Sequence, residues 1–308
     1  MSLDALLDDY DGLGLADLIR RGEVAAAEVL EASIARIEAR DPAVNAVVHR
    51  FFDDARAELA GSAPAGPFAG LPFLLKDLYT FQKGRPCGNG SRWMADYVAP
   101  FDDPLAALWR QAGLTVAGKS ATAEFGLSVS TDTRQHGATR NPWSPEHSAG
   151  GSSGGAAAAV AAGMVPLAHA SDGGGSIRIP ASCCGLFGLK PSRGRNLTSD
   201  AWGGLGVFHA ITRSVRDSAA LLDATCGPPA HLPFSLPRPQ VPFLASVGAD
   251  PIGQNGGRLR IAWTAVTPED VDLHPECRSS VPPLWRPASG TRSPRRRRGS
   301  TTACCAGR

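Results

Sequence analysis

Apolar residues near the amino terminus recur at the three- and four-residue spacing of a helix. Two successive segments within residues 15–40 carry this pattern, with apolar positions at Leu15, Leu18, Ile19, Val29, Leu30, Ile34 and Ile37. The spacing predicts two amphipathic helices, and a third helix is predicted over residues 51–60. Proline cannot continue a helix interior, so we expect the second helix to end at residues 41–42. These helices are expected to pack as one layer on a sheet.

Short apolar runs further along the chain predict strands. The predicted strands cover residues 71–76, 114–118, 165–170 and 259–263, and predicted helices cover residues 104–111, 156–162, 214–225 and 271–281. A short apolar run bounded by turn residues is consistent with a buried strand. Residues 127–149 are polar and residues 227–257 are rich in Pro and Gly, so we interpret both as loops. The first strand ends in Lys76, which taken alone indicates only a solvated lysine.

Two glycine-rich loops flank the helix and strand predicted over residues 156–170, and each loop presents serine. The first loop, GGSSGG, carries Ser152 and Ser153, and the second, DGGGSIR, carries Ser176 after three glycines. The order of loop, helix, strand and loop can bring both serine loops to one end of a sheet. Glycine lets backbone N–H groups approach a ligand closely, so Ser176 stands beside several amide donors. A nucleophile requires such donors to hold an oxyanion.

Two other interpretations of the first serine loop need to be weighed. Ser153 fits the GxSxG nucleophile elbow, but that elbow should follow a strand, and residues 145–149 have the pattern of a polar loop. A Ser–His–Asp enzyme also needs a placed histidine, and neither His209 nor His231 lies in a recognisable motif. Alternatively, the serines of this loop cap the helix that follows.

The sequence context argues against a phosphate site and against a zinc site. Residues 113–120 fit the pattern GxxxxGK[ST], but that loop should follow a strand and open a helix. Here the four intervening residues are themselves the predicted strand, so we expect Lys119 and Ser120 to begin a turn. His136 and His147 lie in the polar loop without a third ligand at suitable spacing, and we expect both to be solvated.

Several segments in the same order resemble the signature of the amidase signature family, serine hydrolases with a Ser–Ser–Lys triad. The resemblance is carried by LPFLLKD at residues 71–77, GKSATAEFG at 118–126, RNPW at 140–143, GGSSGG at 150–155, DGGGSIR at 172–178, GLKPSRGR at 188–195 and TRSVRDSAALLDA at 212–224. It implies an α/β fold in which helices cover both faces of a mixed central sheet. Because the family's carboxyl-terminal third is missing here, the fold is expected to be incomplete at that end.

The resemblance implies a catalytic triad of Lys76, Ser152 and Ser176, with a cis peptide bond before Ser152. The other implied roles are oxyanion binding by the backbone N–H groups of Gly173, Gly174, Gly175 and Ser176, and support from Ser153, Asp172 and Arg178. Free lysine is protonated at neutral pH, but burial lowers its pKa, so a neutral Lys76 can serve as base. Ser176 would attack the amide carbonyl and Ser152 would relay the proton to the leaving amine.

The implied substrate is a small-molecule carboxylic amide. Residues 172–195 resemble members that open linear or cyclic aliphatic amides, such as nylon-oligomer hydrolases. An alternative within the family is the amidase subunit of a tRNA-dependent amidotransferase, which works with partner subunits. Ile179 stands where that branch typically has Gln, which argues against it. A further hypothesis of a different class is an inactive, truncated homologue, and activity with a simple amide separates these interpretations.

We expect three parts in the chain, and the last is the most unusual. Residues 1–65 are expected to pack as a helical segment on an α/β core of residues 66–281, and residues 282–308 form a tail with seven arginines and no acidic residue. Family members continue after residue 281 with a helical pattern, so we infer a frameshift or truncation near Val281. We expect Pro282 and Pro283 to end the last helix, the tail to be disordered, and the 308-residue product to be inactive or poorly soluble.

Composition and charge bear on the partners and the cellular compartment of the protein. The chain is 43% hydrophobic, its net charge of +2 favours no nucleic-acid partner, and no run of 18 apolar residues predicts a membrane span. The acidic amino terminus lacks the basic region of a signal peptide. An odd number of cysteines without a CxxC pair indicates free thiols in a reducing cytoplasm. We expect no cofactor, metal ion, nucleic acid or membrane partner, and we include a homodimer among the hypotheses.

Overall fold

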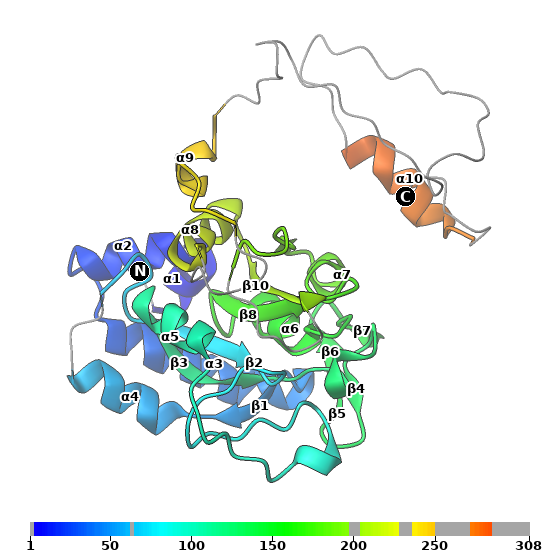
Figure 1. The fold of residues 1–308 in the computed structure, drawn as a ribbon, viewed down its shortest axis with the longest axis horizontal. Coiled ribbons are helices and arrows are strands. Elements are labelled where there is room, and N and C mark those ends of the chain that lie inside the picture. Colours follow the sequence, from blue (N-terminus) through cyan, green and yellow to red (C-terminus); the bar gives the residue numbers. More distant parts are fainter. Residues whose placement is uncertain (1–2, 62–64, 197–203, 228–235, 250–271, 285–308) are drawn as a thin grey trace. The chain divides into compact units, whose positions relative to one another are not determined.

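The computed structural model describes residues 3–61, 65–196, 204–227, 236–249 and 272–284 (Figure 1). The chain divides into two units, residues 1–248 and residues 249–308. The first unit contains a sheet with helices on both faces, as the sequence predicts. The strand predicted over residues 259–263 lies outside the described residues. No described helix is long and apolar enough to cross a bilayer.

A mixed six-stranded sheet forms the centre of the first unit, in the order β1-β3-β2-β8-β10-β9 (Figure 1). The strands are β1 (Val47–Arg50), β2 (Leu71–Lys76), β3 (Leu114–Ser120), β8 (Leu167–Asp172), β9 (Phe187–Gly188) and β10 (Val207–Thr212). Strand β2 runs parallel to β3 and β8, whereas β1, β9 and β10 pair antiparallel with their neighbours. The carboxyl ends of β2 and β8 therefore meet at one edge of the sheet, where the serine loops also lie.

Nine helices are described in the first unit, and those that the sequence predicts lie close to their expected ranges. They are α1 (Leu3–Asp9), α2 (Gly12–Arg20), α3 (Ala26–Val44), α4 (Phe52–Gly61), α5 (Pro104–Gln111), α6 (Gly154–Ala161), α7 (Arg178–Cys183), α8 (Val215–Thr225) and α9 (Phe243–Ser246). Two short 3-10 helices span Arg92–Met94 and Glu124–Gly126. Helix α9 falls within the segment that we expected to be an irregular connection.

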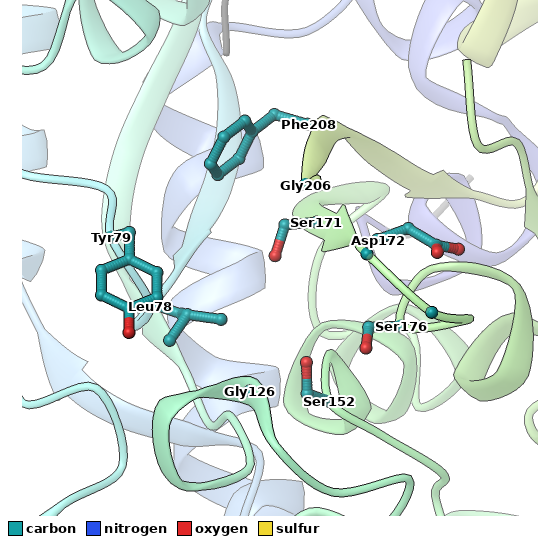
Figure 2. Close-up of a pocket in the computed structure, with 11 residues that line it drawn as sticks. Leu78, Tyr79, Gly126, Ser152, Ser171, Asp172, Ser176, Gly206 and Phe208 are labelled. Carbon is teal, nitrogen blue, oxygen red and sulfur yellow. The ribbon is translucent and has the colours of Figure 1, made fainter. Parts of the chain in front are cut away.

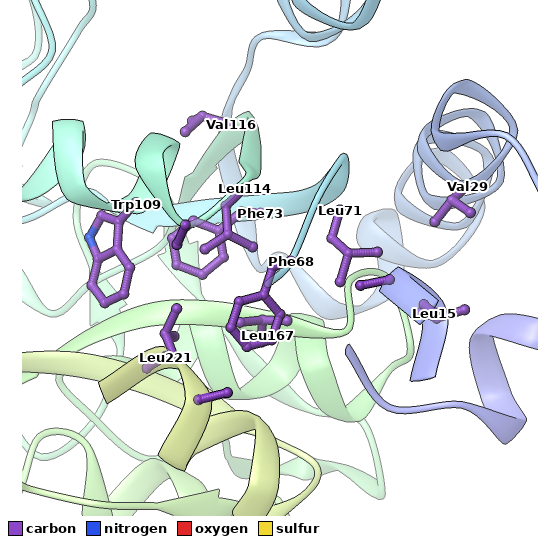
Figure 3. Close-up of a cluster of buried hydrophobic side chains, with 14 of the residues drawn as sticks. Leu15, Val29, Phe68, Leu71, Phe73, Trp109, Leu114, Val116, Leu167 and Leu221 are labelled. Carbon is purple, nitrogen blue, oxygen red and sulfur yellow. The ribbon is translucent and has the colours of Figure 1, made fainter. Parts of the chain in front are cut away.

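The two faces of the sheet bury separate apolar clusters. On one face, side chains of α2, α5 and α8 pack on β2, β3 and β8, including Leu15, Trp109 and Leu221 (Figure 3). On the other face, the alanines of α6 and Ile37 of α3 pack on Leu74 and the small side chains of β8. Alanine adds no bulk, so α6 can lie close to the strands that carry the two serine loops.

The amino-terminal helices are tied to a helix about 200 residues later in the chain. Asp217 of α8 accepts hydrogen bonds from the backbone N–H groups of Gly12 and Leu13, both at 2.8 Å, at the start of α2. Asp11, the N-cap of α2, accepts from Arg216 at 2.6 Å and from Ser214 at 2.6 Å. The two bonds to Asp217 satisfy N–H groups that a helix start leaves without intrahelical partners.

Three predictions about the ends of elements are wrong. Helix α3 passes through Pro42 to Val44, because proline in the last turn removes a single N–H donor and the chain turns only at Asn45, whose φ is 58°. Lys119 and Ser120 belong to β3 rather than to a turn, because β2 pairs with β3 as far as Ser120.

The second unit gives the third of these corrections. Helix α10 spans Pro275–Leu284, so the prediction that the helix stops before Pro282 is wrong. Proline lacks the N–H donor of a helical turn, and α10 ends directly after its two consecutive prolines. Residues 282–284 therefore lie in a helix, contrary to the disorder expected for 282–308, and residues 285–308 lie outside the described residues.

The polar segment 127–149 is not an irregular loop. It contains two small antiparallel pairs, β4 (Asp132–Thr133) with β5 (Gly137–Ala138) and β6 (Arg140–Asn141) with β7 (Ser144–Ser148). These strands are mostly exposed and short, so they carry no apolar alternation that could predict them. Strand β7 leads into the first serine loop, which corrects the expectation that a polar loop precedes it.

Candidate active site

Lys76 ends strand β2 with its side chain fully buried. Its Nζ lies 2.7 Å from Oγ of Ser152 and 3.0 Å from Oγ of Ser171. Burial lowers the pKa of Lys76 to about 7, and the carboxylate of Asp172 opposes this shift only in part. A substantial fraction of Lys76 is therefore neutral near pH 7, as a general base must be.

The first serine loop joins β7 to α6 and brings Ser152 to this lysine. The peptide bond between Gly151 and Ser152 is cis, as the resemblance implies. The carbonyl of Ser152 accepts hydrogen bonds from the amide of Ala123 at 3.1 Å and from Oγ1 of Thr131 at 3.3 Å. Two hydrogen bonds thus hold the carbonyl of Ser152, and its hydroxyl is directed to Lys76.

Ser153 connects the two serine loops rather than capping α6. Its Oγ donates to the carbonyl of Ser171 at 3.3 Å, and the amide of Ser171 lies 3.4 Å from the same Oγ. The amide of Ser153 donates to the carbonyl of Ser176 at 3.3 Å. Although Ser153 is the N-cap residue, its side chain makes no capping hydrogen bond. Being fully buried, Ser153 is also poorly placed for attack on a substrate.

Ser176 lies in the second serine loop, between β8 and α7. It is partly exposed, unlike Ser152 and Ser153. Figure 2 shows the side chains of Ser176, Ser152 and Ser171 gathered around one pocket, with their hydroxyl groups facing it. Among these serines, Ser176 is the one that a substrate in the pocket can reach most readily.

Asp172 organises the second serine loop from its buried position at the end of β8. Its carboxylate accepts from the amides of Gly175 at 2.7 Å and Ile177 at 3.2 Å, and from Nε and Nη2 of Arg178, both at 2.9 Å. Burial raises the pKa of Asp172, but these hydrogen bonds, with that from Arg178 largest, outweigh burial and lower it overall. The loop is therefore braced by an ionised carboxylate with both oxygens in use.

The glycines of this loop are not equivalent as oxyanion donors. The N–H group of Gly175 is committed to Asp172, so it is not available to a substrate in this conformation. No described residue accepts a hydrogen bond from the N–H groups of Gly173, Gly174 or Ser176. Gly175 has a φ of 137°, a value that side-chain-bearing residues rarely adopt.

The pocket beside these groups combines the serine loops with apolar walls. Its lining residues are Leu78, Tyr79, Gly126, Ser152, Ser171, Asp172, Gly173, Gly174, Ser176, Gly206 and Phe208 (Figure 2). The empty space amounts to about 410 Å³, part of which is open to solvent. The apolar walls come from the loop after β2 and from β10, on the sides away from the serine loops.

Sequence reasoning missed two residues of β8 that contact Lys76. Ser171 contacts Nζ, and Nδ1 of His169 lies 3.2 Å from the backbone nitrogen of Lys76. His169 lies in the apolar run predicted over residues 165–170, and Ser171 follows that run directly. Their alternation along a predicted strand places them on one face, and this signal could have indicated them.

Other candidate groups lie away from this pocket. Lys119 is fully buried in β3, with Nζ 3.5 Å from Oδ1 of Asp77. Because Leu114–Ser120 is a strand, the segment is not a phosphate loop. His147 contacts Ser144 on the surface, and His136 is half-buried beside His49. The described residues contain no group of three or more His, Cys, Asp or Glu side chains suited to a metal ion.

Comparison with known proteins decides the family. The family model described as Amidase matches residues 28–283. This chain belongs to the amidase signature family. It is 42% identical over 283 residues to the 6-aminohexanoate-cyclic-dimer hydrolase of Paenarthrobacter ureafaciens, covering 88% of this chain and 55% of that protein.

Solved structures of the same family share its fold. A structure of 6-aminohexanoate cyclic dimer hydrolase matches with a TM-score of 0.75 at 40% identity, over 82% of this chain and 52% of that one. One subunit of the glutamyl-tRNA(Gln) amidotransferase of Thermotoga maritima matches with a TM-score of 0.62 at 31% identity, over 80% and 51%. The chain spans about half the length of the curated relatives it matches.

Proposed function

We propose that this site hydrolyses the C–N bond of carboxylic amides through an acyl-enzyme on Ser176. The observation that carries the proposal is the hydrogen bond of 2.7 Å between Nζ of Lys76 and Oγ of Ser152, in a pocket that Ser176 also lines. A serine hydroxyl is a weak nucleophile until a base accepts its proton. Buried Lys76 supplies that base, and Ser152 lies between it and the pocket.

The reaction then proceeds in two halves. Oγ of Ser176 attacks the amide carbonyl while its proton passes through Ser152 to Lys76. The N–H groups of Gly173, Gly174 and Ser176 are the donors for the developing oxyanion. The proton returns through Ser152 to the leaving amine, and the acyl group stays on Ser176. Water attacks the ester with the same base, which releases the carboxylic acid and restores Ser176.

The walls of the pocket support an uncharged, largely aliphatic acyl group as substrate. Leu78, Tyr79 and Phe208 face the serines, and the one charged side chain among the lining residues, Asp172, has both carboxylate oxygens occupied within its own loop. Linear and cyclic aliphatic amides, including the 6-aminohexanoate cyclic dimer, are therefore the first substrates to test.

The decisive experiment measures amide hydrolysis by two proteins. One is the 308-residue chain, and the other joins residues 1–281 to the carboxyl-terminal half of the Paenarthrobacter hydrolase. We expect the chimera to release amine from simple aliphatic amides, and its Ser176→Ala variant to release none. A folded chimera without amidase activity would contradict the proposed function. Comparison with the 308-residue chain tests the prediction that this chain is inactive or poorly soluble.

The second candidate function is that of an amidotransferase subunit. It is favoured by the structural similarity of this chain to the Thermotoga maritima subunit. A subunit of that kind is expected to need its partner proteins, whereas the proposed amidase acts on a simple amide alone. Measuring turnover of the purified chimera without added proteins separates the two.

The cellular setting is also part of the proposal. A reducing compartment, the cytoplasm, is supported by five free cysteines among the described residues. A homodimer stays a hypothesis, which light scattering on the purified chain tests.

A further inference from the structure

Strands β2 and β8 separate at the point where the base leaves the sheet. They pair in register at Leu74 and Ala168. If the parallel ladder continued, the N–H group of Lys76 would donate to a carbonyl of β8. Instead it donates to Nδ1 of His169 at a nitrogen–nitrogen distance of 3.2 Å. A side chain of β8 thus replaces a backbone partner beside the proposed base.

His169 is held in a fixed orientation by its surroundings. It has no exposed surface, and its ring stacks on Phe208 with centroids 5.6 Å apart and lies 5.7 Å from the ring of Trp109. Oγ1 of Thr80, in the loop that follows β2, lies 3.4 Å from Nδ1. The imidazole therefore contacts both the end of β2 and the segment after it.

The hydrogen bond from Lys76 fixes the protonation of His169. Because Nδ1 accepts, it carries no proton, and the neutral ring holds its proton on Nε2. Nε2 finds no partner among the described residues. The ionisable groups facing the ring are Lys76 from β2, Lys119 from β3 and His209 from β10; burial, followed by these charges, lowers the pKa of His169 well below its usual value.

We propose that His169 is a positioning residue for Lys76: as a neutral acceptor it holds the backbone of Lys76 so that Nζ meets Ser152 and Ser171. This inference rests on the proposed function, since it assigns a purpose to a residue next to the proposed base. A neutral ring serves better than a cationic one, because Lys76 becomes positively charged when it accepts the proton of the nucleophile. A second positive charge beside it would oppose that step.

Two substitutions of His169 in the 308-residue chain test the proposal. His169→Leu keeps an apolar volume but removes the acceptor, whereas His169→Asn places an amide oxygen where it can replace Nδ1 as acceptor. His209→Leu is the matched control, because His209 is equally buried on the neighbouring strand but contacts Ser218 rather than Lys76.

The first measurement is amide hydrogen exchange at residue 76, which does not depend on activity. The second is the rate at which a fluorophosphonate labels Ser176, followed against pH. In His169→Leu we expect faster exchange at residue 76 and labelling slower by about 10- to 100-fold, the scale of a displaced catalytic group. We also expect the acid limb of the profile to move to higher pH, because water reaching Lys76 raises its pKa toward the ordinary value.

His169→Asn and His209→Leu are expected to keep the parent's exchange rate at residue 76 and its pH profile. Unchanged exchange and an unchanged profile in a folded His169→Leu variant would overturn the proposal, and so would equal losses in His209→Leu. If His169→Leu does not fold, His169→Asn decides. A parent-like exchange rate at residue 76 and pH profile of labelling in this variant support the proposal, and loss of both overturns it. A parent chain that is not labelled at Ser176 agrees with the inactivity expected of the 308-residue chain; the chimera then tests the proposed function, and the exchange measurement decides the role of His169.

Discussion

Nζ of Lys76 lies 2.7 Å from Oγ of Ser152, and the lysine has no exposed surface. Since burial lowers the pKa of Lys76 from 10.5 to about 7, the base is neutral above pH 7 and protonated below it. Activity is therefore expected to rise with pH through about 7 and to fall on the acid side. Lys76→Ala should lose activity by about 10²- to 10⁴-fold. Measuring kcat/KM of the chimera against pH tests this, and a flat profile across neutral pH contradicts it.

Lys76→Met is expected to make the protein more stable while it inactivates the site. Unfolded lysine binds a proton up to pH 10.5, but folded Lys76 does so only below about 7, so folding expels a proton between these values. Methionine removes this penalty, which adds up to about 5 kcal/mol to the free energy of unfolding, less the hydrogen bonds lost by Ser152 and Ser171. The gain should be largest below pH 7 and should vanish above pH 10.5.

Lys119, the second buried lysine, provides a control, because its replacement by methionine is expected to lower the free energy of unfolding. Nζ of Lys119 lies 3.5 Å from the fully buried carboxylate of Asp77, so Lys119→Met removes the lysine partner of that carboxylate and leaves it with Nε2 of His49 at 3.7 Å. Breaking a buried pair costs roughly 3–5 kcal/mol. Urea unfolding of both variants at several pH values measures the difference, and stabilisation by both substitutions would contradict this account.

Ser176→Ala and Ser153→Ala should distinguish the nucleophile from a serine that only stabilises the structure. The first variant is expected to keep the parent's stability and lose labelling by a fluorophosphonate, because it removes the nucleophile. The second is expected to keep labelling at Ser176 but to lose about 1–3 kcal/mol of stability, since the buried hydroxyl of Ser153 hydrogen-bonds the backbone of Ser171 in β8. Peptide mapping of the labelled parent chain locates the modified residue, and a label on Ser153 would favour the GxSxG interpretation instead.

Two neighbouring glycines should respond differently to alanine. A Cβ at Gly175 would lie 2.5 Å from Cδ1 of Ile179, at a φ of 137°, whereas a Cβ at Gly174 would meet nothing within 4 Å. Gly175→Ala is therefore expected to displace Ser176 and abolish labelling. Gly174→Ala should retain the parent's melting temperature and change mainly KM, because its methyl group enters the pocket. Thermal melts and labelling rates of the pair check this, and equal behaviour would count against the loop geometry.

The sequence allowed the main features of the site to be predicted because its chemistry lies at the ends of recognisable elements. Lys76 closes an apolar run, and Ser176 follows three glycines, so both positions stand out locally. The contacts of His169 and Ser171 with Lys76 depend instead on how far β2 and β8 separate. That separation is set by packing between distant strands, which no local pattern encodes.

The wrong predictions at Pro42 and Gly175 also arise because long-range packing and loop conformation are not encoded locally. Propensity places a boundary at Pro42, but tertiary packing carries α3 on to Val44. The commitment of Gly175 to Asp172 could not be read from a row of three glycines, because each has the same N–H group. Which amide faces a carboxylate and which faces a substrate depends on the φ and ψ angles of the folded loop.

The hydrogen bonds from Gly12 and Leu13 to Asp217 also determine when, during its synthesis, this protein can complete its folding. A ribosome releases the first helices long before it has made residue 217. Until then the start of α2 lacks its partner carboxylate, and Leu15 lacks the surface of α8 that shares its apolar cluster. The earlier strands can cover part of this cluster, but the part that α8 covers stays open until the later residues are made. A nascent chain stalled before residue 217 offers a chaperone an apolar surface that the finished protein conceals.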